Sequence, residues 1–151
     1  MEQIERALEI AREAHSGQLD KGGVDYIEHP IRVAKQVDGS DRKIVALLHD
    51  VVEDCPDWTF ERLRAEGFPD HVVDALEGVT RCEGEDYDAF IRRAAQNPIS
   101  KAVKIADLQD NSDVSRLPTV AEADRARIGK YQRALAFLQT HGVAEGLAPT
   151  S

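Results

Sequence analysis

Apolar residues recur at helical spacing along most of the chain, in short runs separated by glycine, proline or asparagine. Periods of three and four residues are typical of amphipathic helices that pack on a common core. No alternating run has the length and composition of a strand, and residues 24–27 (VDYI) are the best short candidate. The pattern predicts an all-α bundle. With 151 residues, we expect a single domain over residues 1–140, followed by a flexible tail over 141–151.

Glycine, proline and capping residues suggest where these helices begin and end. The first helix should end near Gly17, and a glycine-rich loop over 17–29 should follow. Pro30 suits the first position of the next helix, and it should hold His29 in an extended conformation. Asp41 is the expected N-cap of one continuous helix through residues 44–54. Further helices are expected after Thr59, from Pro69, over 87–94, from Pro98 and over 128–138.

The charge balance limits the kinds of partner. Lys and Arg number 19 against 28 Asp and Glu, for a net charge of −9. A nucleic-acid partner is not expected, because phosphate contacts need a basic surface. No apolar run approaches the ~18–20 residues of a membrane span, so no membrane partner is expected either. Protein partners stay open.

The two cysteines and the amphipathic start of the chain bear on its location. Cys55 and Cys82 form no CxxC motif, so neither a disulfide nor a structural zinc site is expected. The first 15 residues are charged and amphipathic, unlike a secretory signal. A reducing, cytoplasmic location is the expectation.

The strongest chemical signal is the pair His49-Asp50 inside ALLHDVVED, residues 46–54. This segment is apolar on nearly every side, which is typical of a buried central helix. A buried ionised carboxylate is unfavourable by several kcal/mol unless it is paired or bound to a cation. A metal ion would satisfy both residues at once. The alternative is a buried His–Asp pair whose members bond to each other or to the backbone.

Two further segments offer metal-ligating side chains. His29 precedes a proline at a helix start, and Asp107 lies beside the apolar Val103 and Ala106 in VKIADLQDN. Taken singly, each is explained by an exposed histidine or a solvated helix end. Taken together with the central pair, they give two imidazole nitrogens and two carboxylate oxygens. That mixed set suits manganese, iron or zinc, and it does not suit calcium, which takes oxygen ligands.

An acidic pair follows the central histidine and aspartate. Glu53 lies four residues after His49, and Asp54 lies four after Asp50, so each should lie one helical turn further on. A carboxylate there could act as general base toward a water molecule beside the metal. The alternative is a pair of helix-end acids, which the helix dipole slightly disfavours.

The order and spacing of His29, His49-Asp50 and Asp107 resemble the H…HD…D signature of the HD-domain metal-dependent phosphohydrolases. The segments AHSGQLDKGGVDYIEHPIRVA, ALLHDVVED, GVTR and VKIADLQDN are similar to the hydrolase domain of RelA/SpoT-type proteins, in particular the small alarmone hydrolases. The similarity covers about residues 5–135. It implies an HD helical bundle that uses one manganese-type ion to remove the 3′-pyrophosphate of ppGpp and pppGpp, giving GDP or GTP and pyrophosphate.

The resemblance also implies roles for individual residues. It makes Glu53 and Asp54 the catalytic acidic pair, and Asn111 and Tyr131 contacts of the nucleotide. The metal ligands it implies are His29, His49, Asp50 and Asp107.

Two positions depart from the family pattern. Asp20 and Leu108 stand where the family usually has basic residues that help to hold the nucleotide. Lys21 and Lys104 are the nearest candidates to replace those cations. Arg32 and the pair Arg92-Arg93 are further candidates.

These departures keep two other functions open. The chain is then either an HD phosphohydrolase of another nucleotide or phosphorylated cofactor, or a nucleotide sensor without turnover. A chain of 151 residues leaves no room for a synthetase domain beside this one, so we expect hydrolysis only.

Overall fold

The computed structural model describes residues 2–113, 115, 117 and 119–140, and within these the chain is helical without a strand. The predicted all-α fold is confirmed, and VDYI contributes only to an isolated bridge between Leu19 and Asp25. The tail predicted over 141–151 lies outside the described residues. No helix in the described ranges is long and apolar enough to span a membrane. The helices are α1 (Glu2–Ala14), α2 (Glu28–Lys35), α3 (Ser40–Leu48), α4 (Val51–Asp54), α5 (Phe60–Ala65), α6 (Asp70–Gly78), α7 (Tyr87–Ala94), α8 (Pro98–Asn111) and α9 (Glu122–Thr140).

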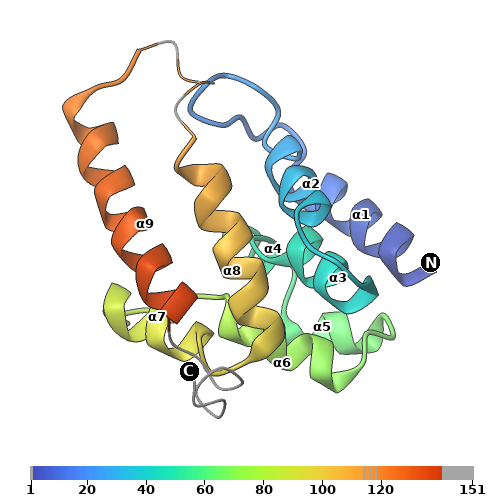
Figure 1. Cartoon of the computed structure of the whole chain (residues 1–151). Helices are drawn as coiled ribbons and strands as arrows, with labels where there is room; N and C mark the ends of the chain where they lie inside the picture. The colour runs from blue at the N-terminus through green and yellow to red at the C-terminus, as the bar shows by residue number, and fades with distance from the viewer. Residues whose placement is uncertain (1, 114, 116, 118, 141–151) are drawn as a thin grey trace.

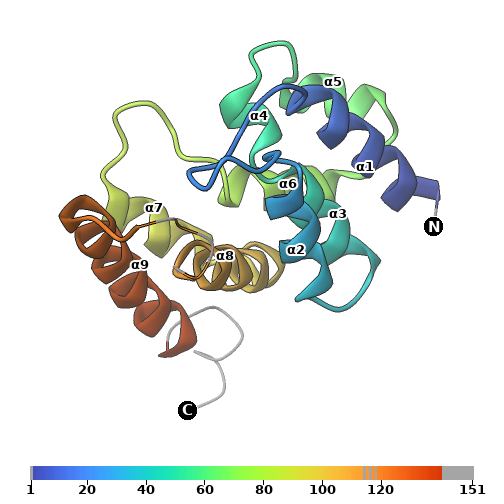
Figure 2. The same cartoon turned by 90° about the horizontal axis from the view of Figure 1, so that it is seen from above.

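Helix α8 lies between two groups of helices. Viewed from above, α1 to α6 lie on one side of it, and α7 and α9 lie on the other (Figures 1 and 2). It contacts α2, α3 and α6 on the first side and α7 and α9 on the second. The side chains of α8 must therefore pack against apolar surfaces on two sides of the helix.

The larger core fills the space among α1 to α6. Each of these helices contributes buried apolar side chains, and Val103 and Ala106 of α8 close the core from one side. Val72, Val73 and Leu76 of α6 are buried, as is Val79 directly after it.

A second, smaller core joins α7, α8 and α9. Phe90 and Ile91 of α7 pack with Leu108 of α8 and with Ala134 and Leu138 of α9. Between its two apolar faces, α8 carries Lys104, Asp107 and Asn111, spaced by three and four residues. This spacing places them on one stripe of the helix. The fold thus places one polar stripe of α8 between two apolar cores.

The helix start predicted after Thr59 is confirmed, the cap predicted at Asp41 is wrong, and Asn97 caps α8 although it was not predicted to. Thr59 Oγ1 accepts a hydrogen bond from Arg62 N at 3.1 Å, and Asn97 Oδ1 accepts one from Ile99 N at 2.9 Å. Asp41 does not cap its helix, because α3 already begins at Ser40 and Gly39 occupies the N-cap position. The carboxylate of Asp41 instead lies 2.8 Å from the ring Nε2 of His71 on α6.

The predicted extended conformation of His29 is also wrong. Helix α2 begins at Glu28, so His29 and Pro30 both lie in its first turn. A proline is tolerated there because first-turn amides have no partner within the helix. The preceding loop adds its own constraint, since His29 N donates a hydrogen bond to Tyr26 O at 2.9 Å.

The continuous helix predicted over 44–54 is interrupted at His49-Asp50. Helix α3 ends at Leu48, and α4 begins at Val51. The Nδ1 of His49 lies 2.6 Å from the carbonyl oxygen of Ala46, which is the oxygen that a continuous helix would offer to the amide of residue 50. Asp50 takes φ −104° and ψ −1°, and the chain turns there. The two residues therefore lie at a corner, where both side chains can face α2 and α8.

A close approach of α6 to α8 gives a direct test of this packing. A methyl group on Gly78 would collide with Ser100 Oγ, which is buried and bonded to Ala75 O at 2.7 Å. We expect Gly78→Ala to reduce the free energy of unfolding by about 1–3 kcal/mol, measured by urea denaturation.

Gly129→Ala is the matched control for that substitution. An added Cβ on Gly129 of α9 meets only Arg133 Nη1, at an ordinary contact distance of 3.5 Å. This variant should gain about 0.5–1 kcal/mol from helix propensity. Equal stability of the two variants would contradict the α6–α8 packing.

Candidate active site

Helices α2 and α8 and the α3–α4 corner bring the predicted metal ligands to one point. The Nε2 of His29 lies 2.9 Å from Asp107 Oδ1, and the Nε2 of His49 lies 3.2 Å from the same oxygen. Asp50 Oδ2 lies 3.2 Å from His49 Nε2 and 3.8 Å from His29 Nε2. His29, His49 and Asp107 are each at most 3% exposed. The four residues named from the sequence therefore meet in space.

Both imidazole rings are held by their Nδ1 atoms. His29 Nδ1 lies 2.6 Å from Asp110 Oδ2, and His49 Nδ1 lies 2.6 Å from Ala46 O. Because a carbonyl or carboxylate oxygen accepts, each Nδ1 donates in this arrangement. Each Nε2 is then the ring atom directed at the carboxylates, and it can bind a metal ion when it gives up its proton.

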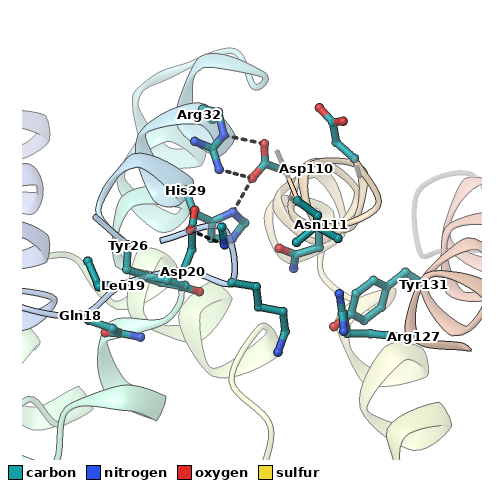
Figure 3. Close-up of a pocket in the computed structure, with 14 residues that line it drawn as sticks. Gln18, Leu19, Asp20, Tyr26, His29, Arg32, Asp110, Asn111, Arg127 and Tyr131 are labelled. Carbon is teal, nitrogen blue, oxygen red and sulfur yellow. Dashed lines mark hydrogen bonds and ion pairs between the residues drawn. The ribbon is translucent and has the colours of Figure 1, made fainter. Parts of the chain in front are cut away.

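Asp110 is a residue of this cluster that the sequence analysis missed. Besides His29, it accepts two hydrogen bonds from Arg32, from Nε at 2.8 Å and from Nη2 at 3.0 Å (Figure 3). Arg32 is therefore engaged in an ion pair with Asp110, and its suggested role as a phosphate-binding cation stays a prediction. The signal was available, because Asp110 lies three residues after Asp107 and Arg32 three after His29, one helical turn in each case.

The carboxylates of the cluster have their own neighbours. Tyr26 donates its hydroxyl hydrogen bond to Asp50 Oδ2. On α8, Asn111 Nδ2 donates to Asp107 Oδ1 at 3.1 Å, and Lys104 Nζ lies 2.9 Å from Asp107 Oδ2. The first contact of Lys104 is thus with a proposed metal ligand.

Opposite charges shift the pKa values in the cluster. Burial by itself would lower the pKa of His49, but the charges of Asp50 and Asp107 outweigh it and raise that pKa well above its usual range. The pKa of His29 is likewise raised, by hydrogen bonds to Asp107 and Asp110 against the effect of burial. Burial would raise the pKa of Asp107, yet Lys104 and the histidines hold it well below its usual range. The carboxylates are therefore ionised and the rings readily take protons.

The donor set fits a divalent cation. The ligating atoms of His29, His49 and Asp50 all lie within 4.8 Å of one another. Two nitrogens with carboxylate oxygens suit a borderline metal ion, which can replace the protons that otherwise balance the buried acids. These residues can hold a divalent metal ion.

The acidic pair lies on α4, at the edge of this cluster. Glu53 Oε1 accepts a hydrogen bond from Arg81 N at 3.2 Å, and Asp54 Oδ2 accepts one from Gln18 Nε2 at 3.3 Å. Partial loss of hydration, together with the negative charge of Asp50, raises the pKa of each carboxyl above its usual range. A raised pKa brings a carboxyl closer to the range useful for proton transfer near neutral pH.

A cavity of about 340 Å³ opens beside His29. The loop between α1 and α2 forms one wall, and α8 and α9 form the other (Figure 3). Its volume lies in the range of small-molecule sites. Lys21, Asn111 and Tyr131, all named from the sequence, line it. Arg127, which the sequence analysis did not single out, lines it too and pairs with Asp124 at 2.9 Å.

The two departures from the family pattern have structural explanations. Asp20 Oδ1 accepts hydrogen bonds from Gly22 N at 2.8 Å and Val24 N at 2.9 Å, so its carboxylate shapes the loop that walls the cavity. Leu108 is fully buried in the smaller core between α8 and α9. One departure therefore builds the cavity wall, and the other packs away from it.

The fold and this cluster define the class of the protein, and comparison with known families agrees. Residues 7–109 match the family described as HD domain. The match covers more than half of the chain and includes all four proposed metal ligands and the acidic pair. The chain belongs to the HD-domain family.

The chain is also similar in sequence to individual proteins with names that mention guanosine nucleotides. The chain is 37% identical over 141 residues to a guanosine-3′,5′-bis(diphosphate) 3′-pyrophosphohydrolase of Aquifex aeolicus, covering 85% of this chain and 20% of that protein. It is 36% identical over 138 residues to a probable GTP pyrophosphokinase of Mycobacterium leprae, covering 82% and 17%. A guanosine-3′,5′-bis(diphosphate) 3′-pyrophosphohydrolase of Spiroplasma citri is 40% identical over 85 residues, covering 54% and 11%. The chain spans about a fifth or less of the length of these relatives.

The protonation of the cluster predicts how metal binding depends on pH. A metal ion binds neutral imidazole, whereas the neighbouring carboxylates hold the pKa values of His29 and His49 above their usual range. Binding of Mn²⁺ should therefore release protons, and the affinity should rise with pH until both raised pKa values are passed. Calorimetric titration in two buffers of different ionisation enthalpy measures the proton release.

Asp110→Asn tests the support of His29 in the same titration. It should weaken Mn²⁺ binding about 10- to 100-fold, the usual effect of losing the partner of a ligating histidine. Asp74→Asn, an exposed acid on α6, is the matched control and should bind as the unaltered chain does. Affinity that is independent of pH, or unchanged in Asp110→Asn, would contradict the ligand assignment.

Proposed function

We propose that this chain hydrolyses the 3′-pyrophosphate of ppGpp and pppGpp, giving GDP or GTP and pyrophosphate. The observation that carries the proposal is the convergence of His29, His49, Asp50 and Asp107, with His29 also lining a cavity of about 340 Å³. The names of the relatives from A. aeolicus and S. citri support the substrate.

The four convergent residues are proposed to hold one divalent ion, with manganese preferred and iron or zinc as alternatives. When bound, such an ion supplies a Lewis acid that polarises a phosphoryl oxygen. Asp110 and the Ala46 carbonyl orient the two imidazoles, and Tyr26 orients Asp50. A cytoplasmic location is part of the proposal, and Cys55 and Cys82, the described cysteines, are both free.

The acidic pair is proposed to move the protons. Water attacks the phosphorus bonded to the 3′ oxygen, and Glu53 takes the proton that the water loses. The bond between that phosphorus and the 3′ oxygen breaks, and Asp54 is the second carboxyl available to return a proton to the leaving oxygen. Arg81 N engages Glu53 Oε1, which leaves Oε2 to face the water.

Binding of the remaining phosphates needs basic side chains that are not fully paired with acidic residues of the protein. Within the described residues, Lys21 lines the cavity without a hydrogen bond or ion pair, and we propose that it contacts phosphate. Lys104 already contacts Asp107, so it supports the ligand first and offers its other two ammonium hydrogens to phosphate. Asn111 and Tyr131 are the proposed contacts of the sugar or phosphates.

The charge of the cavity favours a second candidate function. Three acids line it, Asp20, Asp110 and Asp113, and they balance Lys21, Arg32 and Arg127. A substrate with fewer negative charges than ppGpp would meet less repulsion there. The alternative is therefore an HD phosphohydrolase of another nucleotide or phosphorylated cofactor.

One assay separates the two functions. With Mn²⁺ present, we expect the chain to convert ppGpp into GDP and pyrophosphate, resolved by anion-exchange chromatography. GTP, nucleoside monophosphates and NADPH, assayed in parallel, should turn over more slowly. Release of orthophosphate from ppGpp, or turnover of another compound in place of ppGpp, would favour the alternative.

Glu53→Gln is the matched variant for that assay. It keeps the size of the side chain and its hydrogen bond to Arg81 N while removing the base, so turnover should fall roughly 10²–10⁴-fold. Metal content, measured by elemental analysis, should stay that of the unaltered chain. Near-normal turnover would exclude Glu53 as the base.

A further inference from the structure

His15 is a buried histidine that the proposed chemistry does not use. It is 2% exposed and lies directly after α1. Its Nδ1 lies 2.9 Å from Gln18 Oε1, while its Nε2 is buried without a hydrogen-bond partner among the described residues. Buried polar atoms without partners are uncommon in folded proteins and call for an explanation.

The carboxylate of Asp54 determines which atoms donate in the hydrogen bonds that join His15, Gln18 and Asp54. Asp54 can only accept when ionised, so Gln18 presents its Nε2 to Asp54 Oδ2, at 3.3 Å. The amide oxygen of Gln18 then faces His15, and since that oxygen only accepts, His15 Nδ1 must carry a proton. His15, Gln18 and Asp54 thus form one chain in which every donor points toward the carboxylate.

His15 also supports the other end of α4. Its ring centroid lies 5.0 Å from that of Tyr26, whose hydroxyl donates to Asp50. Asp50 precedes α4, and Asp54 is its last residue. A helix of four residues has little stability of its own, so its two acids depend on contacts from elsewhere.

We propose that His15 is a positioning residue that, through Gln18, fixes the carboxylate of Asp54 for reaction. The inference rests on the function proposed for Asp54. Because Asp54 is exposed, its side chain would otherwise populate several rotamers. Gln18 lines the cavity and can touch substrate, whereas His15 does not line it. His15 therefore acts on the rate of reaction and not on substrate binding.

A double-mutant cycle tests the proposal. His15→Phe keeps a ring against Tyr26 but removes the Nδ1 donor, and kcat should fall about three- to tenfold, the usual range for one hydrogen bond, with KM unchanged. In an Asp54→Asn background the same substitution should change kcat by less than about twofold, because the two residues act through one chain. His15→Asn carries an amide nitrogen on Cγ, where Nδ1 was, and should restore most of kcat.

The control and the contradicting result are equally specific. His71→Phe replaces an exposed histidine on α6 and should leave kcat unchanged. An equal loss of kcat from His15→Phe in both backgrounds would show that His15 serves general packing, and the proposal would be overturned. A rise in KM in His15→Phe, with kcat unchanged, would overturn it as well.

A second readout does not need turnover. Long-range ¹H–¹⁵N NMR of the whole chain reports which ring nitrogen of His15 carries the proton. A neutral ring protonated on Nδ1 supports the proposal, and one protonated on Nε2 overturns it. Failure of the proposed function would instead appear as absence of nucleotide turnover by the unaltered chain, so the two failures are distinguishable.

Discussion

The carboxylate of Asp107 is the group on which the site depends, because it is 3% exposed and must be balanced where it lies. Its oxygens contact both histidine rings, Lys104 and Asn111. Removing Lys104 or a histidine would leave part of this buried charge without compensation, which is unfavourable. A divalent cation would add to this balance at the point where two carboxylates and two Nε2 atoms already meet. Burying these carboxylates is unfavourable without a counter-charge, and for the same reason the cluster attracts a cation.

The fold provides that arrangement through two features of the backbone. Helix α8 packs on one core with Val103 and Ala106 and on another with Leu108, so its remaining stripe faces the site. The corner at His49-Asp50 turns two adjacent residues toward that stripe, although adjacent residues in a continuous helix point about 100° apart. Both features of the backbone place polar side chains together between two apolar cores.

The sequence predicted the helices, their apolar faces and four polar residues that converge, because helical periodicity and the apolar setting of His49-Asp50 are local signals. It did not predict the break at 49–50, because that break depends on a hydrogen bond between a side chain and the backbone that no periodicity reveals. It also missed the ion pair between Arg32 and Asp110, because that pair joins α2 to α8 across 78 residues of chain. Lys104 was expected at phosphate, although its position three residues before Asp107 on one helix already places that carboxylate within its reach. The metal-ligating roles of the four convergent residues stay predictions, as do the roles of Glu53, Asp54, Lys21, Asn111 and Tyr131.

The most direct test of the account is the position of the metal ion in a crystal grown with Mn²⁺. Anomalous diffraction collected at the manganese absorption edge locates the ion without reference to any substrate. The account predicts one strong peak within coordinating distance of the Nε2 atoms of His29 and His49 and of carboxylate oxygens of Asp50 and Asp107. A peak at other residues, or none at this cluster while the protein in solution binds Mn²⁺, would contradict it.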